Sequence, residues 1–340
     1  MTVSDDIDLG RLLADTEAEI LRVVGDRDDS TAPVYEMIRY HLGLDDTDGP
    51  RGKRMRPLLG LLAYMSIAGE HSRALPGAAA VELGHNFSLV HDDIEDGDTE
   101  RRHRATLWAK HGVPQAINTG DLIFSLSRVA LHRLTDLGFS DAKVLRLMRL
   151  YDHTCVLLCE GQYLDIAASA SDEPMTVDGY FDMIGRKTAA LISASIEAGA
   201  LLATDDEDVI GAYRRFGWAL GLAFQLNDDV LGIWGEESTT GKVATDLARH
   251  KKTLPVLYAL QHAKPADRRR LLELSVTSDL GETEVRELAT LIERAGGQAF
   301  TRDEARRYRD EALGELDGLT VVDRAARERL RAIILGVITA

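Results

Sequence analysis

The chain has 340 residues, of which 45% are hydrophobic, and its 40 lysine and arginine residues against 56 aspartate and glutamate residues give a net charge of −16. This apolar content suffices for a large buried core, whereas the acidic balance argues against a nucleic-acid partner that binds a broad basic face. The acidic amino terminus has no pattern of a secretory or transit peptide, and the longest apolar run, residues 189–203, is too short to span a membrane. We therefore expect a soluble cytoplasmic protein.

The amino-terminal part of the chain combines helical patterns with one strongly basic segment. Residues 4–45 show amphipathic helical spacing, and the segment GPRGKRMRP at residues 49–57 precedes an apolar helix predicted over residues 58–67. Pro57 is typical of a first helical turn, so Arg56 would lie at a helix amino terminus, where anions are favoured. The segment is either an anion-binding turn or a solvated basic loop.

A cluster of acidic residues follows the next apolar helix, which is expected to run from Leu75 to Gly97, a typical carboxyl-terminal stop. Asp92, Asp93 and Asp96 share one helix face because they are three and four residues apart. Carboxylates this close repel one another unless a cation lies among them. Mg²⁺ in proteins usually takes one or two carboxylates together with substrate phosphates. The pattern predicts a metal-bound phosphate, with a solvated helix end as the alternative.

The chain shows helical periodicity throughout and no sustained alternation of apolar and polar residues. Long helical patterns cover residues 116–126, 142–161 and 180–203. No repeat and no low-complexity linker divides the sequence. We therefore predict an all-α, single-domain helical bundle over residues 1–340, in which residues 1–32 form a helical extension.

A second apolar helix with an acidic end is predicted over residues 217–235, where Gln225, Asp228 and Asp229 fall on one face. Basic residues follow it at 242–252. Metal ions held by the two acidic helix ends would bind a diphosphate, and the basic residues would neutralise its remaining charge. A diphosphate leaving group above apolar helices favours ionisation of a carbon–oxygen bond, for which stabilisation of the departing diphosphate would supply most of the rate.

In these residues the sequence resembles the trans-isoprenyl diphosphate synthases of the polyprenyl synthetase family, over roughly residues 33–335. The strongest matches are the DDxxD motif at Asp92–Asp96 with Arg101 and Arg102 after it, the GKxxRP motif at Gly52–Pro57, and His85. Other positions in register with the family are Gly161, Gln162, Asp165, Lys187, Thr188, Phe224, Gln225, Lys242, Asp246 and Lys251.

The resemblance implies an all-helical bundle around a central active-site cavity, normally a homodimer. It also implies a Mg²⁺-dependent prenyltransferase of isoprene biosynthesis, with three Mg²⁺ ions in each active site. The reaction would be the head-to-tail condensation of isopentenyl diphosphate with dimethylallyl, geranyl or farnesyl diphosphate, without a nucleic-acid partner and without a membrane span.

The resemblance also implies a role for each matching residue. The implied metal ligands are Asp92, Asp96 and Asp228, supported by Asp93 and Asp229. The residues implied to bind the allylic diphosphate as it leaves, or to steady the cation, are Arg101, Lys187, Thr188, Gln225, Lys242 and Lys251. The residues implied to bind isopentenyl diphosphate are Lys53, Arg56, His85 and Arg102.

Two sites in the sequence bear on the metal affinity and the product length of this chain. The second acidic motif reads DDVLG, so Gly232 stands where the family has its last aspartate; we expect activity to survive, with weaker metal affinity. Phe87 and Ser88 lie one helical turn before Asp92, where the floor of the product cavity is expected. One aromatic residue there resembles geranylgeranyl diphosphate synthases and predicts a twenty-carbon product, unless Phe87 is ordinary core.

Other functions remain open at this point. The product could have the length of a farnesyl diphosphate or a longer chain. A terpene cyclase would use the same metal-bound diphosphate but would not need an isopentenyl site such as Lys53, Arg56, His85 and Arg102. A catalytically silent subunit of a heteromeric synthase would have no need of an intact first motif.

Overall fold

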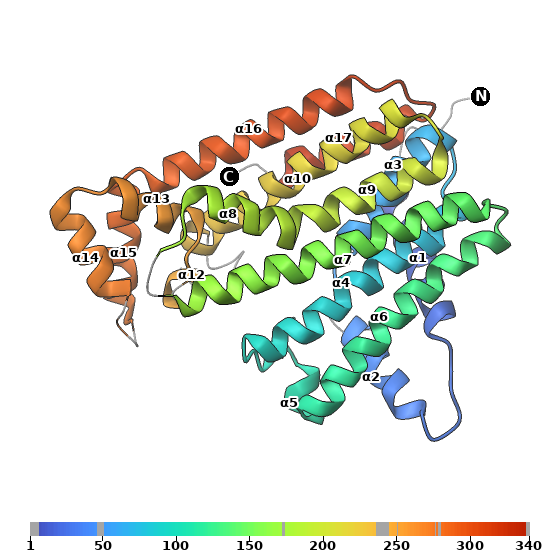
Figure 1. The fold of residues 1–340 in the computed structure, drawn as a ribbon, viewed down its shortest axis with the longest axis horizontal. Helices are drawn as coiled ribbons and strands as arrows, with labels where there is room; N and C mark the ends of the chain where they lie inside the picture. The colour runs from blue at the N-terminus through green and yellow to red at the C-terminus, as the bar shows by residue number, and fades with distance from the viewer. Residues whose placement is uncertain are drawn as a thin grey trace. The chain divides into compact units, whose positions relative to one another are not determined.

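A computed structural model of the chain describes residues 7–45, 51–171, 174–235, 245–249, 251–275, 277 and 280–337. Helices dominate these ranges, which confirms the predicted all-α class (Figure 1). Contacts between residues divide the chain into two compact units. The first unit comprises residues 1–155, 194–213 and 320–330, and the second comprises residues 156–193, 214–319 and 331–340. The single domain over residues 1–340 stays a prediction.

The helices fall into three groups by the unit to which their residues belong. Those of the first unit are α1 (Leu9–Val24), α2 (Ala32–Leu42), α3 (Met55–Ala68), the 3₁₀ turn η1 (Ser72–Ala74), α4 (Leu75–Glu95), α5 (Leu107–His111) and α6 (Val113–Asp136). Those of the second are α8 (Val177–Ile184), the π-helical segment η2 (Gly185–Ala189), α12 (Thr245–Ala248), α13 (Leu254–His262), α14 (Pro265–Ser275), α15 (Glu282–Arg294) and α16 (Gly297–Asp317). Helices with residues in both are α7 (Asp141–Ala170), α9 (Ala190–Ala203), α10 (Glu207–Trp234) and α17 (Arg324–Val337).

Helix α4 is the core element of the first unit. It packs against α6, alongside which it runs in Figure 1, and against α1 and α3. Nearly every residue from Pro76 to Phe87 is buried, as expected of a helix that is apolar on all sides. Gly97 has a positive φ of 68° just beyond the end of the helix, which glycine adopts at low cost. The acidic cluster therefore lies where a buried helix emerges from the core.

A short hairpin that the sequence did not predict follows α4. Strands β1 (Glu100–Arg101) and β2 (Arg104–Ala105) pair antiparallel, with Arg101 opposite Arg104. Arg102 and His103 form the two-residue turn and both have positive φ, 52° and 60°. Turns of this kind favour Asn-Gly or Asp-Gly, so the Arg-His pair gave no signal in the sequence.

In the second unit, α13 packs against α16, α15 and α8. An apolar cluster joins α10, α12, α13, α14 and α15, with Ile233, Leu247, Leu271 and Ile292 among its buried members. Because Leu247 is 2% exposed, the short helix α12 is attached to this core, and its neighbour Asp246 is positioned by it. None of the described helices combines the length and the apolar character that crossing a membrane would require.

Candidate active site

The first acidic motif presents some carboxylates to solvent and holds another in place. Asp93 is 2% exposed, and its Oδ1 accepts a 2.7 Å hydrogen bond from Nε of Arg101, which β1 carries. Burial raises the pKa of the Asp93 carboxyl, although Arg101 opposes this. Asp92 is partly exposed, and Asp96 is exposed as the C-cap residue of α4. Asp93 therefore fixes the hairpin against α4, whereas Asp92 and Asp96 can reach a ligand.

The residues predicted to bind isopentenyl diphosphate lie together in the first unit. Nη1 of Arg56 is 3.0 Å from Nε2 of His85, and because arginine can only donate, Nε2 is the acceptor. Burial and the nearby Arg56 and Arg102 guanidinium groups hold the pKa of His85 well below its usual value, so its ring is neutral. The Arg102 guanidinium lies against Gly52, where an added Cβ would be 2.8 Å from Nη1. Lys53 follows and is exposed.

In the basic segment, Arg54 is buried and bonded to other parts of the protein. Arg54 is 3% exposed, and its Nη1 donates a 2.8 Å hydrogen bond to Oε1 of Glu82 within α4. A second nitrogen donates to the carbonyl oxygen of Leu42, and Nε lies 3.4 Å from Glu17. Charge alone does not separate Arg54 from Lys53 and Arg56, whereas the GKxxRP motif had given a binding role only to Lys53 and Arg56.

The second acidic motif repeats this division between a held and a presented carboxylate. Asp229 is 1% exposed, and its Oδ2 accepts a 2.5 Å hydrogen bond from the hydroxyl of Tyr180. Its Oδ1 accepts a 3.0 Å bond from Nε2 of Gln225, whose Oε1 in turn accepts a 2.8 Å bond from Oγ1 of Thr188. Burial raises the pKa of Asp229 to about 7. Asp228, beside it, is exposed. The sequence analysis missed Tyr180.

Lys187 and Thr188 lie on η2, the π-helical segment that interrupts the predicted helix over residues 180–203. Such segments are frequent at functional sites. Nζ of Lys187 lies 2.5 Å from Oδ2 of Asp165 on α7. This close approach depends on Gly161, where an added Cβ would be 2.4 Å from the backbone nitrogen of Lys187. The structure therefore brings Asp165, Gly161 and Lys187 together, three residues that the sequence analysis had only placed in register with the family.

Lys251 and Lys242 are the other two lysines predicted to bind the allylic diphosphate. Nζ of Lys251 lies 3.9 Å from Oδ1 of Asp246, and the Lys251 side chain is 53% exposed. Lys242 lies outside the described residues. The second unit thus joins Thr188 and Gln225 in a network around Asp229 and pairs Lys187 with Asp165.

The comparisons with known proteins identify the family. Residues 37–292 match the model of the polyprenyl synthetase family. The chain belongs to that family. It is 38% identical to the (2E,6E)-farnesyl diphosphate synthase of Mycobacterium tuberculosis over 318 residues, which cover 91% of this chain and 86% of that protein. It is 40% identical to the geranylgeranyl diphosphate synthase of the same species over 271 residues, covering 78% and 76%.

The fold of this polyprenyl synthetase family member agrees with solved structures. A polyprenyl synthetase from Streptomyces coelicolor A3(2) superposes with a TM-score of 0.88 at 38% identity, covering 97% of this chain and 98% of that one. A geranylgeranyl pyrophosphate synthetase from Pyrococcus horikoshii gives a TM-score of 0.88 at 30% identity over 97% and 98%. The prediction of a prenyltransferase of isoprenoid biosynthesis, in the short-chain prenyl diphosphate synthase family, is thereby confirmed.

The carboxylates of this synthase fit the divalent metal that the family uses. Among the described residues, no three histidine, cysteine, aspartate or glutamate side chains are grouped into a ready metal cage. A hard cation such as Mg²⁺ does not need one, since it takes one or two carboxylates and completes its shell with phosphates and water. Asp92, Asp96 and Asp228 supply oxygen donors of the right type at accessible positions.

The predicted chain-length residues of this synthase lie in α4. Phe87 is 9% exposed. Its ring meets the ring of Phe124 from α6 at 5.0 Å and that of His91 at 6.0 Å, both edge to face. Ser88 is partly exposed, and its Oγ donates a 2.8 Å hydrogen bond to the carbonyl oxygen of His85. Phe124 is therefore a second aromatic residue beside Phe87 that the sequence analysis did not identify.

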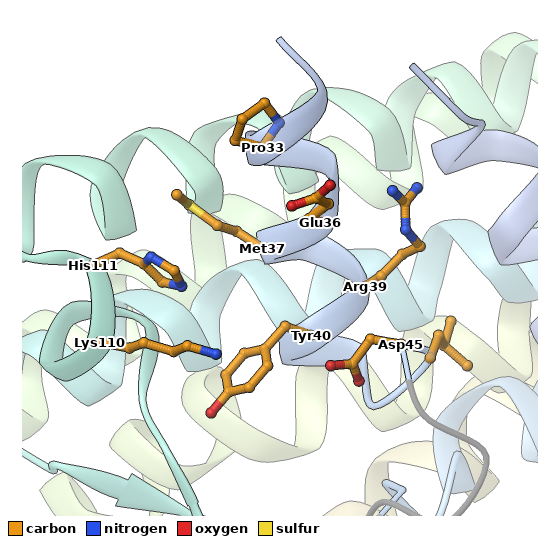
Figure 2. Close-up of a pocket in the computed structure, with 9 residues that line it drawn as sticks. Pro33, Glu36, Met37, Arg39, Tyr40, Asp45, Lys110 and His111 are labelled. Carbon is orange, nitrogen blue, oxygen red and sulfur yellow. The ribbon is translucent and has the colours of Figure 1, made fainter. Parts of the chain in front are cut away.

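The first unit of the synthase also contains an open pocket of about 590 Å³ beside α2 and α5 (Figure 2). Its lining residues are Pro33, Glu36, Met37, Arg39, Tyr40, Leu44, Asp45, Lys110 and His111. Several of its polar groups are engaged: Arg39 donates to the carbonyl oxygen of Gly25, and the Lys110 ammonium lies 3.9 Å above the Tyr40 ring. None of the family motifs contributes a lining residue.

Proposed function

We propose that the chain condenses isopentenyl diphosphate head to tail with dimethylallyl, geranyl or farnesyl diphosphate, using three Mg²⁺ ions. The observation that carries this proposal is the shared plan of the two acidic motifs. In each, the second aspartate is buried and hydrogen-bonded, Asp93 by Arg101 and Asp229 by Tyr180 and Gln225. In each, the first aspartate is accessible. The held aspartate fixes the helix end, so the accessible aspartate beside it can bind a metal with little loss of conformational entropy.

The proposed roles follow from these environments. Asp92, Asp96 and Asp228 bind the metal ions, and Asp93 and Asp229 support them from the core. When bound, the ions polarise the diphosphate and stabilise its charge as the carbon–oxygen bond breaks. Lys187, Lys251, Lys242 and Arg101 neutralise the same leaving group. Lys53, Arg56, His85 and Arg102 hold isopentenyl diphosphate by its phosphates.

The neutral state of His85 has a consequence for this proposed binding. Arg56 occupies Nε2 of His85 as a hydrogen-bond donor, so the ring proton is on Nδ1. A phosphate oxygen can accept a hydrogen bond from Nδ1–H, and the bond from Arg56 to Nε2 fixes the direction of the Arg56 guanidinium. His85 would thus orient Arg56 and add a neutral donor.

Thr188 and Gln225 would steady the allylic cation. Thr188 donates to Oε1 of Gln225, and Gln225 donates to Asp229. Both oxygens therefore keep lone pairs whose direction is set by fixed donors, so that little reorganisation is needed when positive charge develops nearby. The released diphosphate is the proposed base for the final proton.

For the product, we propose geranylgeranyl diphosphate, with farnesyl diphosphate or a longer chain as the alternatives. Support comes from Phe87, a single buried aromatic residue one turn before Asp92 on α4. Its ring is braced by Phe124, so it does not swing aside to make room for a growing chain.

We also propose a cytoplasmic homodimer. Helix α6 exposes 43% of Ile117 and 49% of Val129, and α7 exposes 49% of Leu145. Exposed large apolar side chains on two successive helices can contribute to a surface that binds another protein, and a second copy is the partner that a twofold-symmetric assembly requires.

Incubation of the purified protein with labelled isopentenyl diphosphate, Mg²⁺ and each allylic starter tests the proposal. Elongated diphosphates are the expected product, and chromatography gives their length. Cyclised hydrocarbons would identify a terpene cyclase instead, and no turnover would indicate a silent subunit. Asp92→Asn and Asp228→Asn should each lower turnover at least 10²-fold, on the order of the loss when charge stabilisation of a leaving group is removed.

A further inference from the structure

The hairpin that carries Arg101 and Arg102 is too short to keep its shape without help. Each of its strands has two residues, and a two-stranded hairpin is only marginally stable by itself in water. Its turn is also strained, because Arg102 and His103 both have positive φ, 52° and 60°, a conformation that residues with a Cβ adopt at a cost. Contacts from outside the hairpin must therefore stabilise this shape.

Three contacts attach β2 to α2 and to the segment that follows α2, all within the first unit. Both terminal nitrogens of the Arg104 guanidinium donate to the carboxylate of Asp45, at 3.0 and 2.8 Å. The same guanidinium lies 3.9 Å from the centre of the Tyr40 ring, and the Tyr40 hydroxyl donates a 2.9 Å hydrogen bond to the carbonyl oxygen of Ala105. Asp45 and Tyr40, which both line the pocket in Figure 2, therefore brace β2, and a paired arginine–carboxylate bond fixes direction as well as distance.

Strand β1 is anchored separately, and the turn between the strands depends on both attachments. Arg101 lies opposite Arg104 in the ladder, and its Nε donates to Asp93. Arg102 is the first residue of the turn, so the backbone of the turn sets the direction of its side chain. Its guanidinium lies against Gly52, in the basic segment. A turn that relaxed to negative φ would point Arg102 away from this position.

We propose that Asp45 is a positioning residue for the binding of isopentenyl diphosphate. Through Arg104 it holds the turn in the form that directs Arg102 at this substrate. The inference rests on the proposed function above, which gives Arg102 that role. Neither Asp45 nor Arg104 is among the positions that the sequence motifs assigned. Because Arg101 has its own bond to Asp93, loss of the brace should affect the isopentenyl site more than the allylic one.

The test compares three variants with the wild type. Asp45→Asn removes the charge of the brace. Asp45→Asn/His103→Gly removes it from a turn that no longer needs it, because glycine adopts positive φ at low cost and is favoured in such turns, and the His103 side chain is exposed. Glu207→Gln is the matched control, because Glu207 also accepts two bonds from one arginine, Arg146, in the same unit.

Two measurements are made on each folded variant, with far-UV circular dichroism and urea unfolding as the check of folding. Steady-state kinetics give KM for isopentenyl diphosphate and for the allylic diphosphate separately. Amide hydrogen exchange of residues 99–106, followed by mass spectrometry without substrate, reports on the hairpin itself and does not depend on activity.

We expect Asp45→Asn to raise KM for isopentenyl diphosphate about tenfold, the size of the loss when one hydrogen bond is removed. KM for the allylic diphosphate should change less, and the hairpin amides should exchange faster. The double variant should recover most of both effects, and Glu207→Gln should match the wild type.

An unchanged KM for isopentenyl diphosphate in folded Asp45→Asn would overturn the inference. Equal increases in both KM values would also overturn it, as would a folded double variant no better than Asp45→Asn. A wild type that did not consume isopentenyl diphosphate would contradict the proposed function instead, while the exchange rates would still decide whether Asp45 holds the hairpin.

Discussion

The hydroxyl group of Tyr180 donates a 2.5 Å hydrogen bond to Oδ2 of Asp229, and both residues are almost completely buried. This contact links α8 to the acidic end of α10. Because Asp229 also accepts from Gln225, which accepts from Thr188, Tyr180 supports a network of three proposed site residues without belonging to any family motif found in the sequence.

Tyr180→Phe should destabilise the protein by about 1–3 kcal/mol, the cost of leaving a buried acceptor with one bond fewer. Urea unfolding monitored by circular dichroism measures this. Tyr163→Phe, at a side chain that is 71% exposed, is the matched control and should unfold as the wild type does. Equal stability of the two variants would show that the hydroxyl of Tyr180 contributes nothing to the fold.

The adjacent cations Lys53 and Arg54 should have different roles: Arg54 stabilises the fold, and Lys53 binds substrate. Arg54→Ala removes the ion-pair partner of the buried Glu82 and should cost about 3–5 kcal/mol of unfolding free energy. Lys53→Ala, at an exposed residue, should keep the stability but raise KM for isopentenyl diphosphate. Urea unfolding and steady-state kinetics on both variants check this. Unchanged stability of Arg54→Ala would refute the structural role of Arg54. An unchanged KM of Lys53→Ala would refute the binding role of Lys53.

Replacement of two helical glycines of the second unit by alanine should change the stability of the protein in opposite directions. Gly161→Ala places a methyl group 2.4 Å from the backbone nitrogen of Lys187 and should destabilise by about 1–3 kcal/mol, as overpacking does. Gly314→Ala on α16 meets nothing within 4 Å and should stabilise by about 0.5–1 kcal/mol, because alanine is the better helix former. Thermal unfolding of both proteins tests the pair, and the same sign of change in both would be inconsistent with this packing.

Stability should depend on pH through His41. Burial, together with the Arg101, Arg102 and Arg54 guanidinium groups, lowers the pKa of His41 to about 3. Below pH 6.5 the unfolded chain therefore binds a proton that the folded chain does not, so stability falls as pH falls, by up to about 1.4 kcal/mol per pH unit. Asp229, with its pKa raised to about 7, acts in the opposite direction between about pH 4 and 7.

Comparison of the wild type with His41→Gln isolates the histidine contribution, since both proteins keep Asp229. Urea unfolding at pH values from 5 to 7 should give the variant a smaller loss of stability on acidification. Parallel profiles for the two proteins would mean that His41 is not the group responsible.

Phe87→Ala should lengthen the product. Removing the ring opens the face of α4 one turn before Asp92, and the ring of Phe124 loses its edge-to-face partner. Chromatography of the products from farnesyl diphosphate measures the chain length. Phe181→Ala on α8, which removes a ring beside Tyr308, controls for the general loss of an aromatic group. An unchanged product profile would remove Phe87 from this role.

Local spacing along the chain was enough to predict the helices that carry the motifs and the all-α class, and the resemblance of those motifs to known ones predicted the family. Asp92, Asp93 and Asp96 fall on one face because of the helical repeat, and Pro57 and Gly97 mark helix ends by their own backbone preferences. These signals act over a few residues, so they can be recognised without knowing what packs against them.

Contacts between distant segments could not be predicted in this way. Tyr180 reaches Asp229, Glu82 neutralises Arg54, and Asp246 fills the space at Gly232, although nothing in the local pattern of either partner announces the other. Whether an acidic residue is buried and held or exposed and available depends on which side chains fold against it, because burial and hydrogen bonding set its charge and its freedom. The sequence pattern indicated the chemistry of the acidic residues. Packing within the second unit buried Asp229 and left Asp228 exposed.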